Sequence, residues 1–165
     1  MKELKDLNDV LLNEIQSLYS AETLIIAGLP RMIEKAHNEE LKAAFTQHLA
    51  ETERQRERLE QIAKQFNIDP DDVGNPSLKG LIAEGEKLMH KDAAPEVMDA
   101  VLLAAAQKIE HYEISGYGTA AYLAEELGLN NVAQLLRQTL EEEQKTDTIL
   151  NNLAKNRINR KALEV

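Results

Sequence analysis

The sequence predicts an all-α fold, a bundle of four long helices, and three observations lead to it. Ala, Leu, Glu, Lys and Gln dominate the 165 residues, whereas there are only seven Gly and four Pro, so the composition favours long helices over sheets. Apolar residues recur every three or four positions over long stretches. Apolar residues make up 43% of the chain and charged residues 29%, as in a globular domain with a buried core. We therefore expect a single domain over residues 1–165.

The first two helices are expected to form an antiparallel hairpin. Apolar residues at threes and fours predict a helix over about residues 4–36, in which Pro30 is expected to cause a bend. A second apolar stripe runs from Leu41 to Phe66, after a short break at residues 37–38. Such a short connection predicts that the two helices lie side by side and run in opposite directions.

A crossover is expected to link this hairpin to the second half of the chain. Residues 67–76 (NIDPDDVGNP) concentrate Asp, Asn, Gly and Pro and therefore predict a loop. Ser77 is the expected N-cap of a short helix over about residues 77–91. Pro95 suits the first turn of the next long helix, because a proline there gives up no helical hydrogen bond.

The last two helices are expected to form a second hairpin. Gly128 is the expected C-terminal cap of the third long helix, and the fourth begins at Asn130 or Asn131. Residues 157–165 are expected to form a polar tail that frays. Two helical hairpins joined by a long, partly helical crossover are typical of the ferritin-like four-helix bundle.

Several classes of protein are opposed by the composition. The chain has no cysteine, which excludes disulfides and thiolate metal sites and fits a reducing, cytoplasmic compartment. Its net charge of -10 opposes binding to nucleic acid or to an anionic membrane surface. No apolar run approaches the roughly 20 residues that span a bilayer. No phosphate-binding, dinucleotide-binding or serine-nucleophile motif is present.

Each predicted apolar stripe is interrupted near its middle by acidic residues or a histidine. Because antiparallel packing brings helix midpoints to one level, these side chains are expected to meet in one polar layer inside the bundle. The interrupting residues are Glu22 in the first helix, His48, Glu51, Thr52 and Gln55 in the second, Glu110 and Glu113 in the third, and Glu143 and Asp147 in the fourth.

Several buried carboxylates require compensation, since each ion loses its hydration and repels its neighbours. Two metal ions resolve the repulsion, because carboxylates can bridge them while imidazole completes their coordination. Iron is the preferred metal and manganese the alternative. Bundles of this kind use a Glu-x-x-His pair, whereas this chain has the reversed pair His48 and Glu51, and Glu143 followed by Asp147. The predicted site is therefore either unusually rich in oxygen ligands or bound differently from the standard one.

Four segments resemble the bacterial YciF-like family, which belongs to the ferritin-like superfamily. They are AAQKIEHYEISGYGTAAYLAEELG at residues 105–128, SLYSAET at 17–23, HLAETERQRERLE at 48–60 and TLEEEQKTD at 139–147. The resemblance covers nearly the whole chain. It implies a dimeric four-helix bundle and an association with bacterial stress responses, and it leaves the biochemical activity undefined.

Similarity to rubrerythrin-type members of the superfamily implies a ligand set. Arg54 and Thr146 stand where histidines would be expected, so we infer from spacing that His48 and Asp147 substitute for them. Glu142 is an alternative to Glu143, and His48 is either a ligand, a hydrogen-bond donor to a ligand or an interhelical contact. The implied ligands are Glu22 from the first helix, Glu51 from the second, Glu110 as a bridge and Glu113 from the third, and Glu143 from the fourth.

Two functions from different classes fit these observations. The first is a homodimeric dinuclear metal protein that acts on oxygen or peroxide or oxidises iron. One of Tyr19, Tyr112 and Tyr117, if it lies near the metals, would serve in it as a radical or a proton donor. The second is a non-enzymatic stress protein whose bundle serves as a scaffold for dimerisation or partner binding. In that case protonated acids, or ion pairs with Arg54 and Lys108, would close the polar layer.

Overall fold

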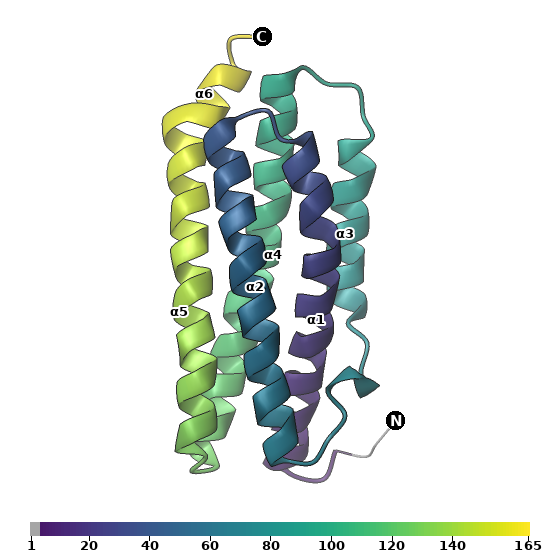
Figure 1. Ribbon diagram of the computed structural model, residues 1–165, viewed down its shortest axis with the longest axis vertical. Helices are drawn as coiled ribbons and strands as arrows, with labels where there is room; N and C mark the ends of the chain where they lie inside the picture. The colour runs from purple at the N-terminus through teal and green to yellow at the C-terminus, as the bar shows by residue number, and fades with distance from the viewer. Residues whose placement is uncertain (1–3) are drawn as a thin grey trace.

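The structure, a computed structural model that describes residues 4–165, is a bundle of four long helices with a shorter helix packed outside it (Figure 1). The prediction of an all-α fold is confirmed, and residues 4–165 contain no strand. The four long helices are α1 (Leu7–Lys35), α2 (Glu39–Gln65), α4 (Pro95–Glu126) and α5 (Asn130–Leu153), and the shorter one is α3 (Pro76–Met89).

The helices begin and end at residues that satisfy their free backbone groups. The side chain of Asn38 accepts hydrogen bonds from the backbone N–H groups of Glu40 and Leu41 at the start of α2. Gly128 has φ of +70° just after α4, which confirms the predicted glycine cap. The helix expected over residues 77–91 instead spans Pro76–Met89, and its N-cap is Asn75 rather than Ser77. Pro76 occupies the first turn and so moves the start of the helix back.

Helix α1 continues through Pro30 and ends at Lys35, one residue before the predicted end. One further expectation differs from the structure. The polar tail expected from residue 157 is instead largely helical, with a π-helical turn at Ala154–Ile158 and a last helix, α6 (Asn159–Ala162). The reason is that Ile158 is only 2% exposed, so burying this one apolar side chain holds the turn against the bundle.

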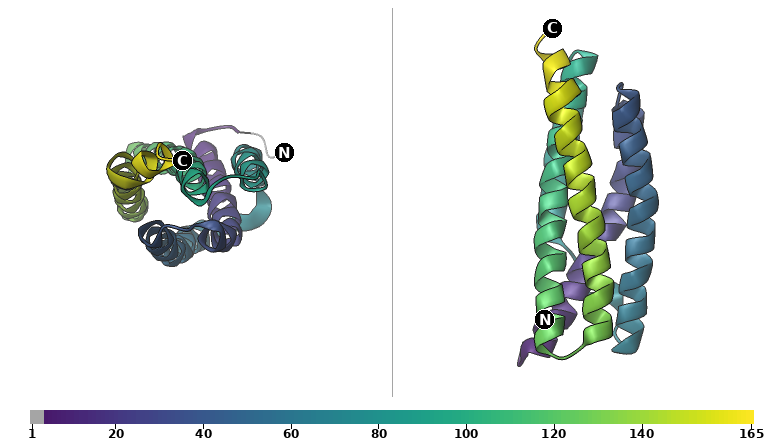
Figure 2. Two further views of the ribbon diagram at one scale, coloured as in Figure 1. Left: turned by 90° about the horizontal axis from the view of Figure 1, so that it is seen from above. Right: turned by 90° about the vertical axis from the view of Figure 1, so that its left-hand side faces the viewer.

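The chain places α1 between α2 and α4, and α5 between α2 and α4, so that the four long helices enclose one core (Figures 1 and 2). Helices α1 and α5 run in one direction and α2 and α4 in the other, because the crossover returns the chain along α3 before α4 begins (Figure 1). Helix α3 packs against α1 and α4 on the outside of the bundle. This is the two-hairpin topology predicted from the long, partly helical crossover.

The core consists of two apolar clusters separated along the bundle axis. One contains Ile25, Phe45 and Ile109, and the other contains Leu18, Leu59 and Tyr117. Every long helix therefore passes from one cluster to the other. The residues at the crossing point are polar and buried, as the interruptions in the sequence predicted.

Candidate metal centre

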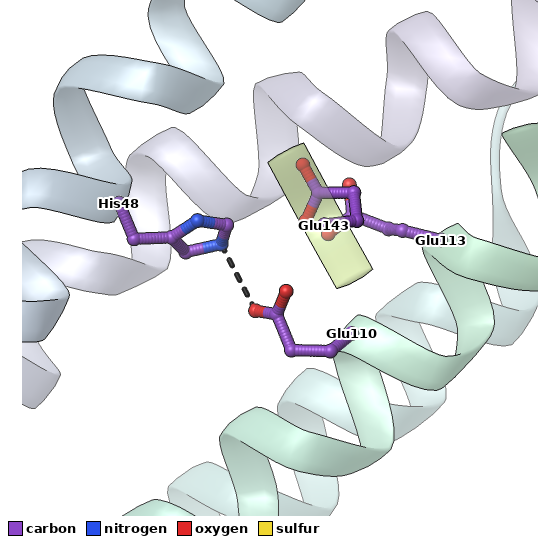
Figure 3. A group of neighbouring side chains, drawn as sticks. All are labelled: His48, Glu110, Glu113 and Glu143. Atoms are coloured by element: carbon purple, nitrogen blue, oxygen red, sulfur yellow. Dashed lines mark ion pairs between the residues drawn. The ribbon is translucent and has the colours of Figure 1, made fainter. Parts of the chain in front are cut away.

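Four side chains from three helices meet between the two apolar clusters. His48 comes from α2, Glu110 and Glu113 lie one turn apart on α4, and Glu143 comes from α5 (Figure 3). Each of them offers an atom that lies within 4.8 Å of those offered by the others. All four are buried, with at most 4% of their surface exposed. The spacing of three residues between Glu110 and Glu113 places both carboxylates on one face of α4.

Glu22 adds a fourth helix to this layer. It is completely buried on α1. Its charge raises the pKa of Glu113, and the charge of Glu143 in turn raises the pKa of Glu22. The hydroxyl of Tyr117 donates a hydrogen bond to Glu22 Oε1. We call the five residues Glu22, His48, Glu110, Glu113 and Glu143 the buried acid cluster.

Most polar atoms of the buried acid cluster lack a hydrogen-bond partner among the described residues. His48 Nε2 lies 3.0 Å from Glu110 Oε1, but the two atoms are not aligned for a hydrogen bond. An unsatisfied buried polar atom costs about 1–3 kcal/mol, and more when it is charged. The unpartnered atoms of the cluster are Glu22 Oε2, both ring nitrogens of His48, Glu110 Oε2, both oxygens of Glu113 and Glu143 Oε2.

The acids of the cluster resist ionisation. Burial, together with the charges of Asp147 and Glu51, raises the pKa of Glu110 to about 8, against a contribution from Glu143 that lowers it. Burial raises the pKa values of Glu22, Glu113 and Glu143 well above their usual range, and repulsion between the carboxylates adds to the effect. Without a cation, the protein therefore favours protonated acids in this layer.

The donor set fits metal ions. Four carboxylates and one imidazole provide oxygen and nitrogen ligands, the combination that suits iron and manganese. Four ionised carboxylates carry the charge that two divalent cations would neutralise. The unpartnered carboxylate oxygens and one ring nitrogen of His48 can offer the lone pairs that such ions need, and these residues come from all four long helices.

The structure places two of the predicted ligands at the edge of the cluster. Glu51 is half-buried, and its Oε1 accepts a hydrogen bond from Gln47 at 3.0 Å. Asp147 is also half-buried; its Oδ1 lies 3.1 Å from His111 Nε2, and its Oδ2 accepts a hydrogen bond from Asn151. Both carboxylates are already engaged with neighbours on or near the surface, although their charges reach Glu110.

The alternative ligand Glu142 belongs to a supporting layer. The two terminal guanidinium nitrogens of Arg58, Nη1 and Nη2, donate to its carboxylate at 2.6 and 2.7 Å. Burial works against ionisation of Glu142, but the hydrogen bonds from Arg58 and Gln55 outweigh it and lower the pKa. Gln55 Nε2 donates to both Glu142 and Glu143, so this amide connects the ion pair to the buried acid cluster.

Gln55 and Tyr117 contact the buried acid cluster, and sequence reasoning assigned neither of them a specific partner there. Gln55 lay in the interrupted stripe, and its regular spacing from Phe45 and Leu59 was the available signal. Tyr117 was one of three tyrosines with no feature to distinguish them. The tertiary contact with Glu22, 95 positions earlier in the chain, is what places it in the site.

No helix within residues 4–165 is both long and apolar enough to cross a membrane.

The fold and the site together define an all-helical bundle with a histidine–glutamate cluster buried at its centre. The chain belongs to the family described as Domain of unknown function (DUF892), whose match spans residues 6–163. It is 42% identical over 160 residues to protein YciF of Escherichia coli (strain K12), and the alignment covers 96% of each protein. The resemblance stated from the sequence is thereby confirmed.

Solved structures agree with this assignment. The crystal structure of the E. coli stress protein YciF matches with a TM-score of 0.90 and 41% identity, over 95% of this chain and 99% of that one. YcfI from Rhodopseudomonas palustris, described as a candidate structural protein, matches with a TM-score of 0.88 and 40% identity, over 91% and 96%. A Xanthomonas campestris protein matches with a TM-score of 0.75 over 96% of both chains; at 21% identity it shares the fold alone.

Proposed function

We propose that this protein binds two metal ions, iron before manganese, in the buried acid cluster, and that it serves in a bacterial stress response. The observation that carries the metal proposal is the set of unpartnered buried oxygens and ring nitrogens contributed by the four long helices. The stress proposal is supported by the likeness to YciF, which is described as a stress protein.

In this proposal, Glu22, His48, Glu110, Glu113 and Glu143 hold the ions. When bound, ions of this kind exchange electrons with dioxygen, peroxide or dissolved iron, so the candidate activities are peroxide removal and iron oxidation. The Tyr117 hydroxyl keeps its proton and donates it in a hydrogen bond to Glu22 Oε1, and Gln55 orients Glu143 through its amide group. The apolar clusters on both sides keep bulk water away from the layer.

A second candidate is a non-enzymatic scaffold that binds a partner or a second copy of the chain. It is supported by the description of YcfI as a candidate structural protein. The raised pKa values of the four acids also mean that protonation can neutralise the layer without a metal. The homodimer and the cytoplasmic location stay predictions from the sequence under either function.

Elemental analysis separates the two functions. The protein is expressed with added iron or manganese, purified, and compared with Glu143→Gln and Glu110→Ala variants. Glu141→Gln is the matched control, because Glu141 is exposed and lies two residues from Glu143 on α5. We expect about two ions per chain in the native protein and the control, and a loss of metal in both cluster variants. Metal-free preparations that melt at the same temperature before and after chelation would support the scaffold.

A further inference from the structure

A narrow apolar cavity lies beside the buried acid cluster, between α1, α3 and α4. Its volume is about 40 Å³. Ile25 and Met32 of α1, Ile82 of α3 and Ala106 of α4 line it. His48 and Glu110 are also on its wall, and they are the most deeply buried polar groups there. The cavity therefore ends at the side of the cluster where the imidazole faces the α4 carboxylate.

Gly28 borders this cavity, and its missing side chain leaves part of the space open. A Cβ atom added at Gly28 would meet no heavy atom within 4 Å. On the opposite wall, a Cβ atom added at Gly85 would lie 3.5 Å from Ala105, in ordinary contact. A larger residue at position 28 would therefore grow into the cavity without striking the backbone of a neighbouring helix.

The other end of the cavity reaches the surface beneath α3. Glu86 and Met89 line the cavity and also an open, charged basin on the outside of the protein. Arg31 of α1 and Glu86 of α3 form an ion pair of 2.6 Å at this boundary, and a second ion pair of 2.7 Å joins Glu84 to Lys108 of α4. Ion pairs with exposed partners contribute little, about 0–1 kcal/mol each, so these two pairs add little to the packing that holds α3 at this boundary.

We infer that this cavity admits a small apolar molecule of the size of dioxygen and holds it beside His48 and Glu110. This inference rests on the proposed metal centre, for which dioxygen would be the oxidant. A cavity of about 40 Å³ is well below the roughly 150 Å³ of a cavity that holds benzene, but it exceeds the roughly 10–15 Å³ that one water needs. Dioxygen needs no hydrogen bonds, whereas peroxide or a hydrated ion would lose its own hydrogen bonds along an apolar wall.

The cavity can be tested in the metal-free protein with xenon, an apolar atom used here as the probe. Crystals of the native protein, of Gly28→Leu and of Gly118→Leu are pressurised with xenon and examined by anomalous diffraction. Gly118 is the matched control, because it is a half-buried helical glycine with nothing within 4 Å of an added Cβ, and it does not line the cavity. Ala105→Leu narrows the same cavity if Gly28→Leu does not fold.

We expect one xenon site in the cavity of the native protein and of Gly118→Leu, and none in Gly28→Leu or Ala105→Leu. No xenon in the native cavity would overturn the inference, as would xenon that persists in both cavity variants.

The route is tested in protein loaded with ferrous iron under anaerobic conditions. Iron content is measured first, and the protein is then mixed with dissolved dioxygen while iron oxidation is followed by absorbance. We expect Gly28→Leu to bind as much iron as the native protein. Its bound iron should be oxidised more slowly, on the order of tenfold, because a close-packed interior leaves dioxygen few other gaps through which to enter. Equal rates of iron oxidation in Gly28→Leu and the native protein would show that dioxygen does not reach the iron through this cavity, even if xenon binds there. Absence of iron from every variant would refute the metal proposal, and the xenon comparison would still decide the cavity.

Discussion

In the metal-free protein, the free energy of unfolding is expected to fall as the pH rises from 5 to 8. Burial raises the pKa of Glu110 from 4.5 to about 8 in the folded chain. A carboxyl whose folded pKa is raised gives its full stabilisation below the unfolded pKa, and this is lost as the pH rises through the folded pKa. The same direction holds for Glu22, Glu113 and Glu143, whose pKa values are also raised.

The magnitude follows from the shift at Glu110. Each pH unit between the unfolded and folded pKa values costs about 1.4 kcal/mol, so this residue alone removes about 4 kcal/mol between pH 5 and pH 8. That loss is a large part of the roughly 5–15 kcal/mol that stabilises a typical domain. For a chain of this length it corresponds to a fall in melting temperature of about 10 °C.

Calorimetry of chelator-treated protein at pH 5, 6, 7 and 8 checks this expectation. Glu110→Gln removes the titrating group, so its melting temperature should depend less on pH than that of the native protein. Glu141→Gln, at an exposed position on the same bundle, should follow the native curve. A metal-free melting temperature that is constant or rises from pH 5 to pH 8 would refute the reasoning.

Three further predictions concern single contacts, each measured by urea unfolding of the metal-free protein. Arg58→Ala leaves Glu142 without its guanidinium partner and should lower the free energy of unfolding by about 2 kcal/mol at pH 7; no change would show that the pair is not stabilising. Asp99→Asn should cost about 1–2 kcal/mol, because Asp99 accepts both the His37 and Asn38 backbone N–H groups, at 2.7 and 2.9 Å, and an amide offers one acceptor oxygen. Gly116→Ala places a Cβ 2.9 Å from the end of the Leu18 side chain, so we expect a loss of about 1 kcal/mol, and a gain would contradict this close approach.

The depth of the buried acids could be predicted because it depends only on helical spacing. Glu22 lies four residues after Leu18 and three before Ile25, so a helix that buries both leucine and isoleucine must also bury the glutamate. The same argument applies to Glu110 and Glu143, which interrupt the stripes of α4 and α5.

The face of α2 was harder to predict, because chemistry and spacing pointed to different residues. Its buried positions step by three and four residues, as a regular inward stripe does. Glu51 precedes one of them, Thr52, and therefore points about 100° away around the helix. An acid was preferred as a ligand, whereas spacing alone selects Thr52 and Gln55. The buried residues in this stretch are Phe45, His48, Thr52, Gln55 and Leu59.

The choice between Glu142 and Glu143 could not be made from local sequence. Both lie near the inward face of α5, and Arg58, 84 positions earlier than Glu142, holds that residue at the edge. Which of two adjacent acids enters the core therefore depends on a contact between α2 and α5. Such a contact exists only after the helices have packed.

The central claim is that metal ions occupy the buried acid cluster, and anomalous X-ray diffraction from crystals grown with iron or manganese tests it most directly. Data collected on both sides of the metal absorption edge locate each ion without assumption about its ligands. The account predicts two peaks within coordination distance of the oxygen and nitrogen atoms of Glu22, His48, Glu110, Glu113 and Glu143. Diffraction with no anomalous peak between the two apolar clusters, or with metal bound only at surface carboxylates, would contradict it.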